Sequence, residues 1–132
     1  LARGNSRDLY LDAYPGLNGA RMFTLSEEGS NESAIFSIAD PLGSQGEISR
    51  LVSEGYIVRS RSDSGGEEAD SNDTARRDAA FESGAHSIST DYPGKVDGLD
   101  YWVEVPNGTP SRCNPISSPD WCTSEGIEHL SQ

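Results

Sequence analysis

The amino-acid sequence predicts a mixed α/β fold with a parallel sheet. Along its 132 residues, a helical pattern that ends at a turn signal is repeatedly followed by an alternating run rich in β-formers. The resulting order of helix, strand, helix, strand, helix, strand is typical of a parallel sheet whose strands are joined through helices. So few strands leave two open edges and two faces to cover, so we expect further parts of the protein to complete the fold.

The first helix and strand pair occupies residues 7–27. In "RDLYLDAYPG", Leu9 and Ala13 lie on one face of a predicted helix, and the Pro-Gly pair ends it. The run "ARMFTLSE" over residues 20–27 predicts the first strand. Residues 27–44 then join the first predicted strand to the second predicted helix. This loop is longer than such connections usually are, and long loops are often functional.

The second pair predicts a helix in "GEISRLVSEG", with Ile48, Leu51 and Val52 on one face and a stop at Gly55. The run "YIVRSRSD" follows as a strand. Its alternation predicts a face that carries Ile57, Arg59, Arg61 and Asp63.

Two arginines and an aspartate on an inner face are costly to bury unless they are paired or bind something anionic. Two compatible interpretations stay open. One is an internal Arg and Asp network that fills the fold. In the other, Arg61 and Asp63 contact a phosphorylated or polyhydroxyl ligand, while Arg59 lies deeper as support and pairs with a buried acid.

The third pair covers residues 72–93. The side-chain oxygens of Asn72, Asp73 and Thr74 predict the start of a helix of about three turns, and Gly84 predicts its left-handed end. The run "HSIST" then predicts a strand that ends in Thr-Asp-Tyr-Pro.

Residues 94–132 depart from this order and predict an irregular tail. One alternating strand lies among its turn-rich segments, with three residues on one side: Tyr101, Val103 and Val105. Cys113 and Cys122 are nine residues apart, and neither their spacing nor their neighbours suit zinc, so we expect a local disulfide. A disulfide predicts a secreted, extracellular protein.

The amino-acid composition argues against some classes of function and for others. The net charge is −12 with Lys95 as the only lysine, so no basic stripe can follow a phosphate backbone, and we expect no nucleic-acid partner. Large aliphatic and Phe residues are few, but the patterned helices and seven Trp and Tyr residues argue for a folded chain. Sequons at Asn31, Asn72 and Asn107 fit a secreted glycoprotein.

Several motifs in register resemble a known family. The segments "YIVRSRSDSG", "NDTARRDAAFESGAHSISTDYP" and "RCNPISSPDWC" are similar to the carboxyl-terminal portion of the calcium-dependent phosphoinositide-specific phospholipase C family of bacteria and fungi. The resemblance is clearest from Gly55 to Cys122. It implies that residues 1–93 are the carboxyl-terminal part of a (β/α)8 TIM-like barrel, with its sixth to eighth strands. The initial Leu and the lack of a strand before the first helix fit this view, so we expect the amino-terminal part of the same protein as a partner.

The resemblance also implies an activity. The family's enzymes are phosphodiesterases that act at membrane surfaces and cleave the glycerophosphoryl bond of phosphatidylinositol-type lipids. They are thought to use two histidines as general base and general acid, with calcium to stabilise the transition state. His86 begins its predicted strand and His129 lies at the end of the tail, so we expect the catalytic pair and the calcium ligands to lie outside this chain.

The remaining candidates would bind substrate. Arg61, with Asp63 and Arg59, is expected at the inositol hydroxyls or phosphate, and Tyr92 is expected to stack on the sugar ring. Asp91 faces the other way along a regular strand, so we expect it to cap or pair.

Two questions stay open at this point. Glu27 and Glu28 follow the first predicted strand and either reach a metal or stay solvated, which is the commoner fate of loop carboxylates. A non-catalytic extracellular glycoprotein with a binding or structural role is the alternative function, because a fold alone does not determine activity.

Overall fold

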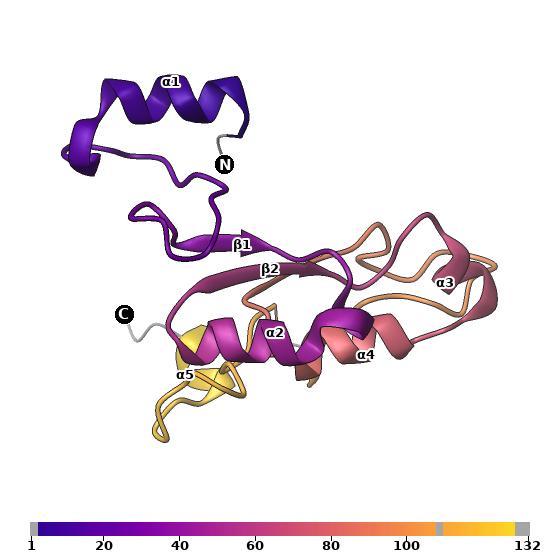
Figure 1. Cartoon of the computed structure of the whole chain (residues 1–132). Helices are drawn as coiled ribbons and strands as arrows, with labels where there is room; N and C mark the ends of the chain where they lie inside the picture. The colour runs from indigo at the N-terminus through magenta and orange to yellow at the C-terminus, as the bar shows by residue number, and fades with distance from the viewer. Residues whose placement is uncertain (1–2, 108–109, 129–132) are drawn as a thin grey trace.

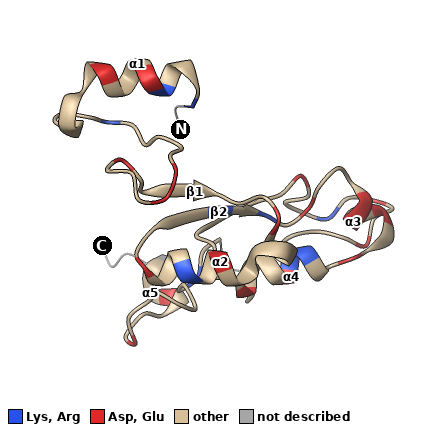
Figure 2. Ribbon diagram, in the orientation of Figure 1, with Lys and Arg blue, Asp and Glu red and all other residues tan. Residues whose placement is uncertain are grey.

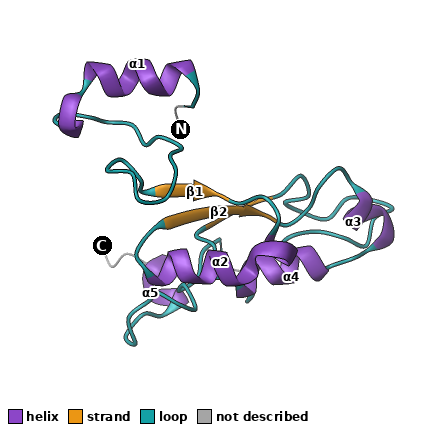
Figure 3. Ribbon diagram, viewed as in Figure 1, coloured by secondary structure: helices purple, strands orange, loops and turns teal. Residues whose placement is uncertain are grey.

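The computed structural model describes residues 3–107 and 110–128 and shows a mixed α/β chain (Figure 3). None of the helices described there has the length and apolar content that a membrane span requires. The elements in chain order are α1 (Asn5–Ala13), η1 (Pro15–Leu17), β1 (Ile35–Ser37), α2 (Pro41–Ser53), β2 (Ile57–Arg61), α3 (Glu67–Ser71), α4 (Ala75–Glu82), β3 (Ser87–Ser89) and α5 (Ser124–Glu128).

The strands form a parallel sheet in the order β1-β2-β3, as the repeated helix and strand order predicts. Ile35 of β1 lies opposite Ile57 of β2, and Arg59 of β2 lies opposite Ser87 of β3. Helix α2 connects β1 to β2, while α3 and α4 lie between β2 and β3. The carboxyl ends of β2 and β3 therefore meet at one edge of the sheet.

The first strand lies later than the sequence pattern predicts. Residues 20–27 form no strand, and Leu25 makes only an isolated parallel bridge to Ile35. The paired strand is β1, in the region that was expected to be a loop. It ends three residues before Asp40, the N-cap of α2, so that helix can return the chain to β2 after a short connection.

Helices α2 and α4 cover one face of the sheet (Figure 1). Ile48, Leu51 and Val52 of α2 pack against Val58 of β2, and all four side chains are almost completely buried. Each contributes roughly 1.5 to 3 kcal/mol through burial of apolar surface. This cluster is the hydrophobic core of the described residues.

The predicted helix ends are confirmed. Gly55 and Gly84 follow α2 and α4 with φ of 91° and 76°, a conformation that favours glycine. Asp73 accepts a hydrogen bond from the Ala75 amide at the start of α4. Helix α4 is shorter than expected, at 8 residues, and a short helix that was not predicted, α3, precedes it.

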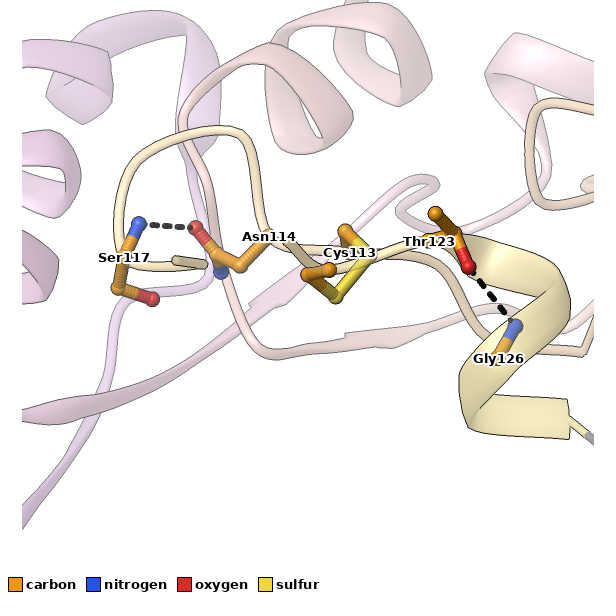
Figure 4. Close-up of a disulfide and its surroundings, with 6 residues drawn as sticks. Cys113, Asn114, Ser117, Thr123 and Gly126 are labelled. Carbon is orange, nitrogen blue, oxygen red and sulfur yellow. Dashed lines mark hydrogen bonds between the residues drawn. A yellow bond between two sulfur atoms is a disulfide. The ribbon is translucent and has the colours of Figure 1, made fainter. Parts of the chain in front are cut away.

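The described part of the tail is mostly irregular, but it contains the short helix α5, which was not predicted, and residues 101–105 form no strand. Cys113 and Cys122 form the expected disulfide, with Cα atoms 6.0 Å apart (Figure 4). Within this loop the Asn114 carboxamide accepts a hydrogen bond from the Ser117 amide. Asn114 also donates a hydrogen bond to the Gly84 carbonyl, which anchors the tail to the end of α4.

Helix α1 lies apart from the layer formed by the sheet and its two covering helices (Figure 1). It has no buried residue, and Leu9, which was predicted on its apolar face, is 71% exposed. Arg7 holds the helix to the following loop through Ser26 and an ion pair with Glu32. The helix is confirmed, but within the described residues its apolar face has no partner.

Candidate functional site

Charged side chains meet where β2 and β3 end. Arg61 is the last residue of β2, and Asp91 follows β3 by two residues. Nη2 of Arg61 donates a hydrogen bond to Oδ2 of Asp91 at 3.1 Å, and Nε of Arg61 donates to the Asp63 carbonyl at 3.1 Å. We call Arg61, Asp63 and Asp91 the strand-end cluster. The Arg61 and Asp91 side chains are 31% and 64% exposed, so a ligand can reach both.

Asp63 is the buried member of this cluster, with no exposed surface. Its carboxylate accepts hydrogen bonds from the Thr90 hydroxyl at 2.6 Å, the Ser62 hydroxyl at 2.8 Å and the Asp91 amide at 3.0 Å. Burial raises the pKa of Asp63, but these hydrogen bonds and the positive charge of Arg61 outweigh it, so the net shift is downward. Asp63 is therefore ionised at neutral pH.

Asp63 lies just beyond the end of β2, and both it and Ser62 are buried. The Ser62 amide bonds to the Ser89 carbonyl, so the pairing with β3 continues one residue past β2. The Asp63 carboxylate reaches the end of β3, where it accepts hydrogen bonds from the Thr90 hydroxyl and the Asp91 amide.

Tyr92 packs beside the strand-end cluster. Its ring meets that of Tyr101 edge to face, with centroids 5.6 Å apart. Its amide donates to the Thr90 hydroxyl, and its carbonyl accepts from the Val103 amide. A side-chain carbon at Gly66 would lie 3.2 Å from the Tyr92 hydroxyl, so glycine leaves room for this ring. Tyr92 is partly exposed and lies one residue after Asp91.

Arg59 lies deeper on the same face of β2. Its guanidinium donates to the hydroxyls of Ser89, at 2.9 Å, and Ser37, at 3.3 Å. Among the described residues Arg59 forms no ion pair, so the buried acid that was expected as its partner is not one of them. Asp63 instead lies 3.8 Å from Nη2 of Arg61. Arg61 is thus part of an Arg and Asp network and is also exposed enough for a ligand to reach it.

The loop carboxylates Glu27 and Glu28 join no metal site formed by the described residues. Glu28 forms an ion pair with Arg50 at 2.7 Å, and the hydrogen bond from Arg50 lowers the pKa of Glu28. Glu27 is exposed in a turn. Within residues 3–107 and 110–128, no group of three or more His, Cys, Asp or Glu side chains is arranged to hold a metal ion.

His86 does not join the strand-end cluster. His86 precedes β3, so it lies at the opposite end of the sheet, where its Nδ1 accepts a hydrogen bond from the Val58 amide. His129 lies outside the described residues. Among the sequons, Asn31, Asn72 and Asn107 are all exposed, although Thr109 of the last sequon is also outside the described residues.

The surroundings of the strand ends are acidic. Figure 2 shows α3, which follows β2, as an acidic helix. Its Glu68 is held by the Ser64 amide and by Nε of Arg76 at 2.7 Å. A free polyanion would be repelled here, whereas a polyhydroxyl compound with one phosphate group would meet both donors and acceptors.

Sequence reasoning missed three residues that shape this site: Ser62, Thr90 and Tyr101. The pattern "SIST" before Asp91 contained the one available signal, because a hydroxyl at a strand end often bonds a neighbouring loop. Their partners lie 27 to 39 residues away along the chain, so only the sheet register and the packing of the tail bring them together.

Comparison with known proteins identifies a family. A family model described as phosphoinositide phospholipase C, Ca²⁺-dependent, matches residues 2–115. The match therefore begins well before Gly55, where the resemblance was expected to become clear. No curated protein and no solved structure among those compared matches the chain.

Proposed function

The chain belongs to the Ca²⁺-dependent phosphoinositide phospholipase C family, and from this premise we propose that it is part of a secreted phosphodiesterase that cleaves the glycerophosphoryl bond of phosphatidylinositol-type lipids. The family supports the substrate class. The disulfide between Cys113 and Cys122 supports export, because such bonds persist in oxidising compartments. The lipid substrate implies action at a membrane surface, with the chain bound peripherally.

We further propose that β1, β2 and β3 are the sixth, seventh and eighth strands of a (β/α)8 barrel that the amino-terminal part of the same protein completes. Two features support this. The strands are parallel and joined through helices, and those helices cover only one face of the sheet. The other face carries Arg59 and Arg61, as an inner barrel face with a polar lining would.

The observation that carries the proposed function is the pair formed by Arg61 and Asp91. It places a guanidinium and a carboxylate side by side at the carboxyl ends of adjacent parallel strands. A guanidinium donates to hydroxyl or phosphate oxygens, while a carboxylate accepts from hydroxyl hydrogens. Two neighbouring inositol hydroxyls, or one hydroxyl beside the phosphate, match this arrangement. Tyr92 is proposed to contact the sugar ring from the side.

Calcium is proposed as the cofactor from the family description alone. The described residues do not fit it, since they contain no cluster of acidic or imidazole side chains arranged for a metal. We therefore place the calcium ligands outside these residues. The two catalytic histidines are proposed to lie there too, because His86 is at the opposite end of the sheet from Arg61. This chain supplies substrate contacts.

The test compares Arg61→Met with Arg59→Met in the complete protein, using phosphatidylinositol vesicles and measuring release of soluble inositol phosphate together with the thermal midpoint. Loss of a charge-assisted contact at Arg61 should slow cleavage by about 30- to 1,000-fold, or roughly 2 to 4 kcal/mol in the barrier. Arg59→Met is the matched control, since Arg59 lies on the same face but bonds only serine hydroxyls among the described residues. Arg59→Met should lower the thermal midpoint, and its cleavage rate should fall only as stability is lost.

Equal cleavage by Arg61→Met and the parent would remove Arg61 from the site. If the complete parent binds inositol phosphate but releases no product from any inositol lipid, the non-catalytic extracellular glycoprotein is the better description.

A further inference from the structure

We infer that Asp63 is a positioning residue, whose buried carboxylate joins the ends of β2 and β3 so that Arg61 and Asp91 are presented together. The inference rests on the proposed function, because it takes Arg61 and Asp91 as the pair that contacts substrate. It gives Asp63 a different role from the direct ligand contact that the sequence pattern suggests.

The carboxylate of Asp63 has no surface left for a ligand. Oδ2 accepts from the hydroxyls of Ser62 and Thr90, and Oδ1 accepts from the Asp91 amide. The guanidinium of Arg61 lies 3.8 Å from Oδ1 on the remaining side. These contacts come from both strand ends, so the carboxylate acts as a bridge between them.

Asp63 contacts both members of the exposed pair. Its backbone carbonyl accepts from Nε of Arg61, and its carboxylate holds the backbone amide of Asp91. A guanidinium is planar, so a bond to Nε and a bond to Nη2 together determine the direction of its plane. The Nε bond ends on Asp63, and the Nη2 bond ends on a residue whose backbone Asp63 holds. Asp63 therefore controls both anchors of Arg61.

The surroundings strengthen this bridge. The Tyr101 hydroxyl donates to the Ser62 carbonyl at 2.9 Å, and Tyr101 has no exposed surface. Hydrogen bonds are stronger electrostatically when water is excluded, and a partly broken buried network is costly. Both carboxylate oxygens of Asp63 have hydrogen-bond partners, so Arg61 and Asp91 are the members of the cluster that expose surface to a ligand.

The experiment is a double-mutant cycle in the complete protein, with myo-inositol 1-phosphate as the probe and its dissociation constant measured by calorimetry. Asp63→Asn should weaken binding by roughly tenfold, which is within the range of coupled neighbours. The double variant Arg61→Met with Asp63→Asn should bind no more weakly than Arg61→Met alone, because Asp63 acts through Arg61. Additive losses would overturn the inference and leave the proposed function intact.

Thr90→Val is a second variant for the case in which Asp63→Asn does not fold. It removes one bond to Oδ2 and keeps the charge, so it should weaken binding in the same direction and by less. Val52→Ala is the stability control: it lowers the thermal midpoint through the core, away from the strand ends, and should leave the dissociation constant unchanged below that midpoint.

A spectroscopic measurement separates this inference from the proposed function. The Nε hydrogen of Arg61 should give an ordered, slowly exchanging NMR signal in the parent. Its acceptor is the Asp63 backbone carbonyl, which Asn keeps, so Asp63→Asn should weaken the signal because the carboxylate no longer holds that carbonyl in place. Persistence of that signal in Asp63→Asn would overturn the positioning role, whatever the binding data show. If Arg61→Met leaves probe binding unchanged, the proposed contact fails, and the NMR signal still decides whether Asp63 orients Arg61.

Discussion

The hydroxyl of Tyr101 donates a hydrogen bond to the backbone carbonyl of Ser62 at 2.9 Å, and neither residue has exposed surface. The two residues are 39 positions apart, one in the tail and one just after β2. Burial raises the pKa of Tyr101, and the negative charge of Asp63 raises it further. The tail is thus part of the interior that supports the strand-end cluster, although residues 101–105 form no strand.

Tyr101→Phe tests this contact. The change leaves the Ser62 carbonyl buried without its donor, which should lower the free energy of unfolding by about 1 to 3 kcal/mol. Chemical denaturation of the complete protein measures it. Tyr56→Phe is the matched control, because Tyr56 also packs edge to face on an aromatic ring and its hydroxyl has no hydrogen bond within the described residues. Equal losses in the two variants would show that the Tyr101 hydroxyl contributes little.

Gly84→Ala should destabilise the protein for two separable reasons. A left-handed residue with a side chain costs about 1 to 2 kcal/mol, and the added carbon would lie 2.6 Å from Cδ1 of Ile116. Gly98→Ala is the control, since Gly98 has φ of 85° and nothing within 4 Å of such a carbon. Gly84→Ala should lower the thermal midpoint more than Gly98→Ala does. Adding Ile116→Ala should lessen the difference, and a difference that is unaffected would exclude this clash.

The disulfide should be present in the isolated protein and should stabilise it. Thiol labelling of the denatured, unreduced chain should find no reactive Cys113 or Cys122, and prior reduction should expose both. Replacing both by Ala should cost about 2 to 3 kcal/mol, because the bond closes a loop with a sequence separation of 9. Recovery of two reactive thiols without reduction would contradict the pairing.

Acid should destabilise the protein through Asp63 and Glu68. Burial raises the pKa of each, but hydrogen bonds and the nearby arginines lower it by more. Because the folded-state pKa values lie below those of the unfolded chain, their stabilisation is complete above the unfolded values and is lost as pH falls through the folded ones. The temperature of the thermal midpoint should therefore decrease once the pH is lower than about 4. Asp63→Asn should show a smaller fall between pH 6 and pH 3 than the parent, and an unchanged fall would assign the acid sensitivity elsewhere.

Local signals in the sequence determined much of the architecture. Gly55 and Gly84 end helices because a left-handed residue is needed at each end, and this requirement is visible without any neighbour. The alternation of β2 placed Val58 on the helix-covered face and Arg59 and Arg61 on the other, because a strand has a period of two. The disulfide followed from two cysteines close in sequence, and the family followed from motifs that lie within single segments.

Other features required contacts between distant segments. β1 was missed because Ile35–Ser37 is too short to stand out, and its pairing with β2 selects it over the longer alternating run at residues 20–27. The prediction that Asp91 caps or pairs was confirmed, but its partner, Arg61, lies 30 residues earlier. Alternation assigned Asp63 to the inner face, but it could not identify the partners at the end of β3 that bury its carboxylate.

The sequence by itself therefore determined the class of fold, the helix ends, the arginine face of β2 and the disulfide, because each depends on residues within about ten positions of one another. Only the tertiary structure decided which segment pairs with β2, and which partners Arg61 and Asp63 have. Those contacts join residues about 30 positions apart through the register of a parallel sheet. A register is selected by the packing of whole elements, and no single segment carries that information.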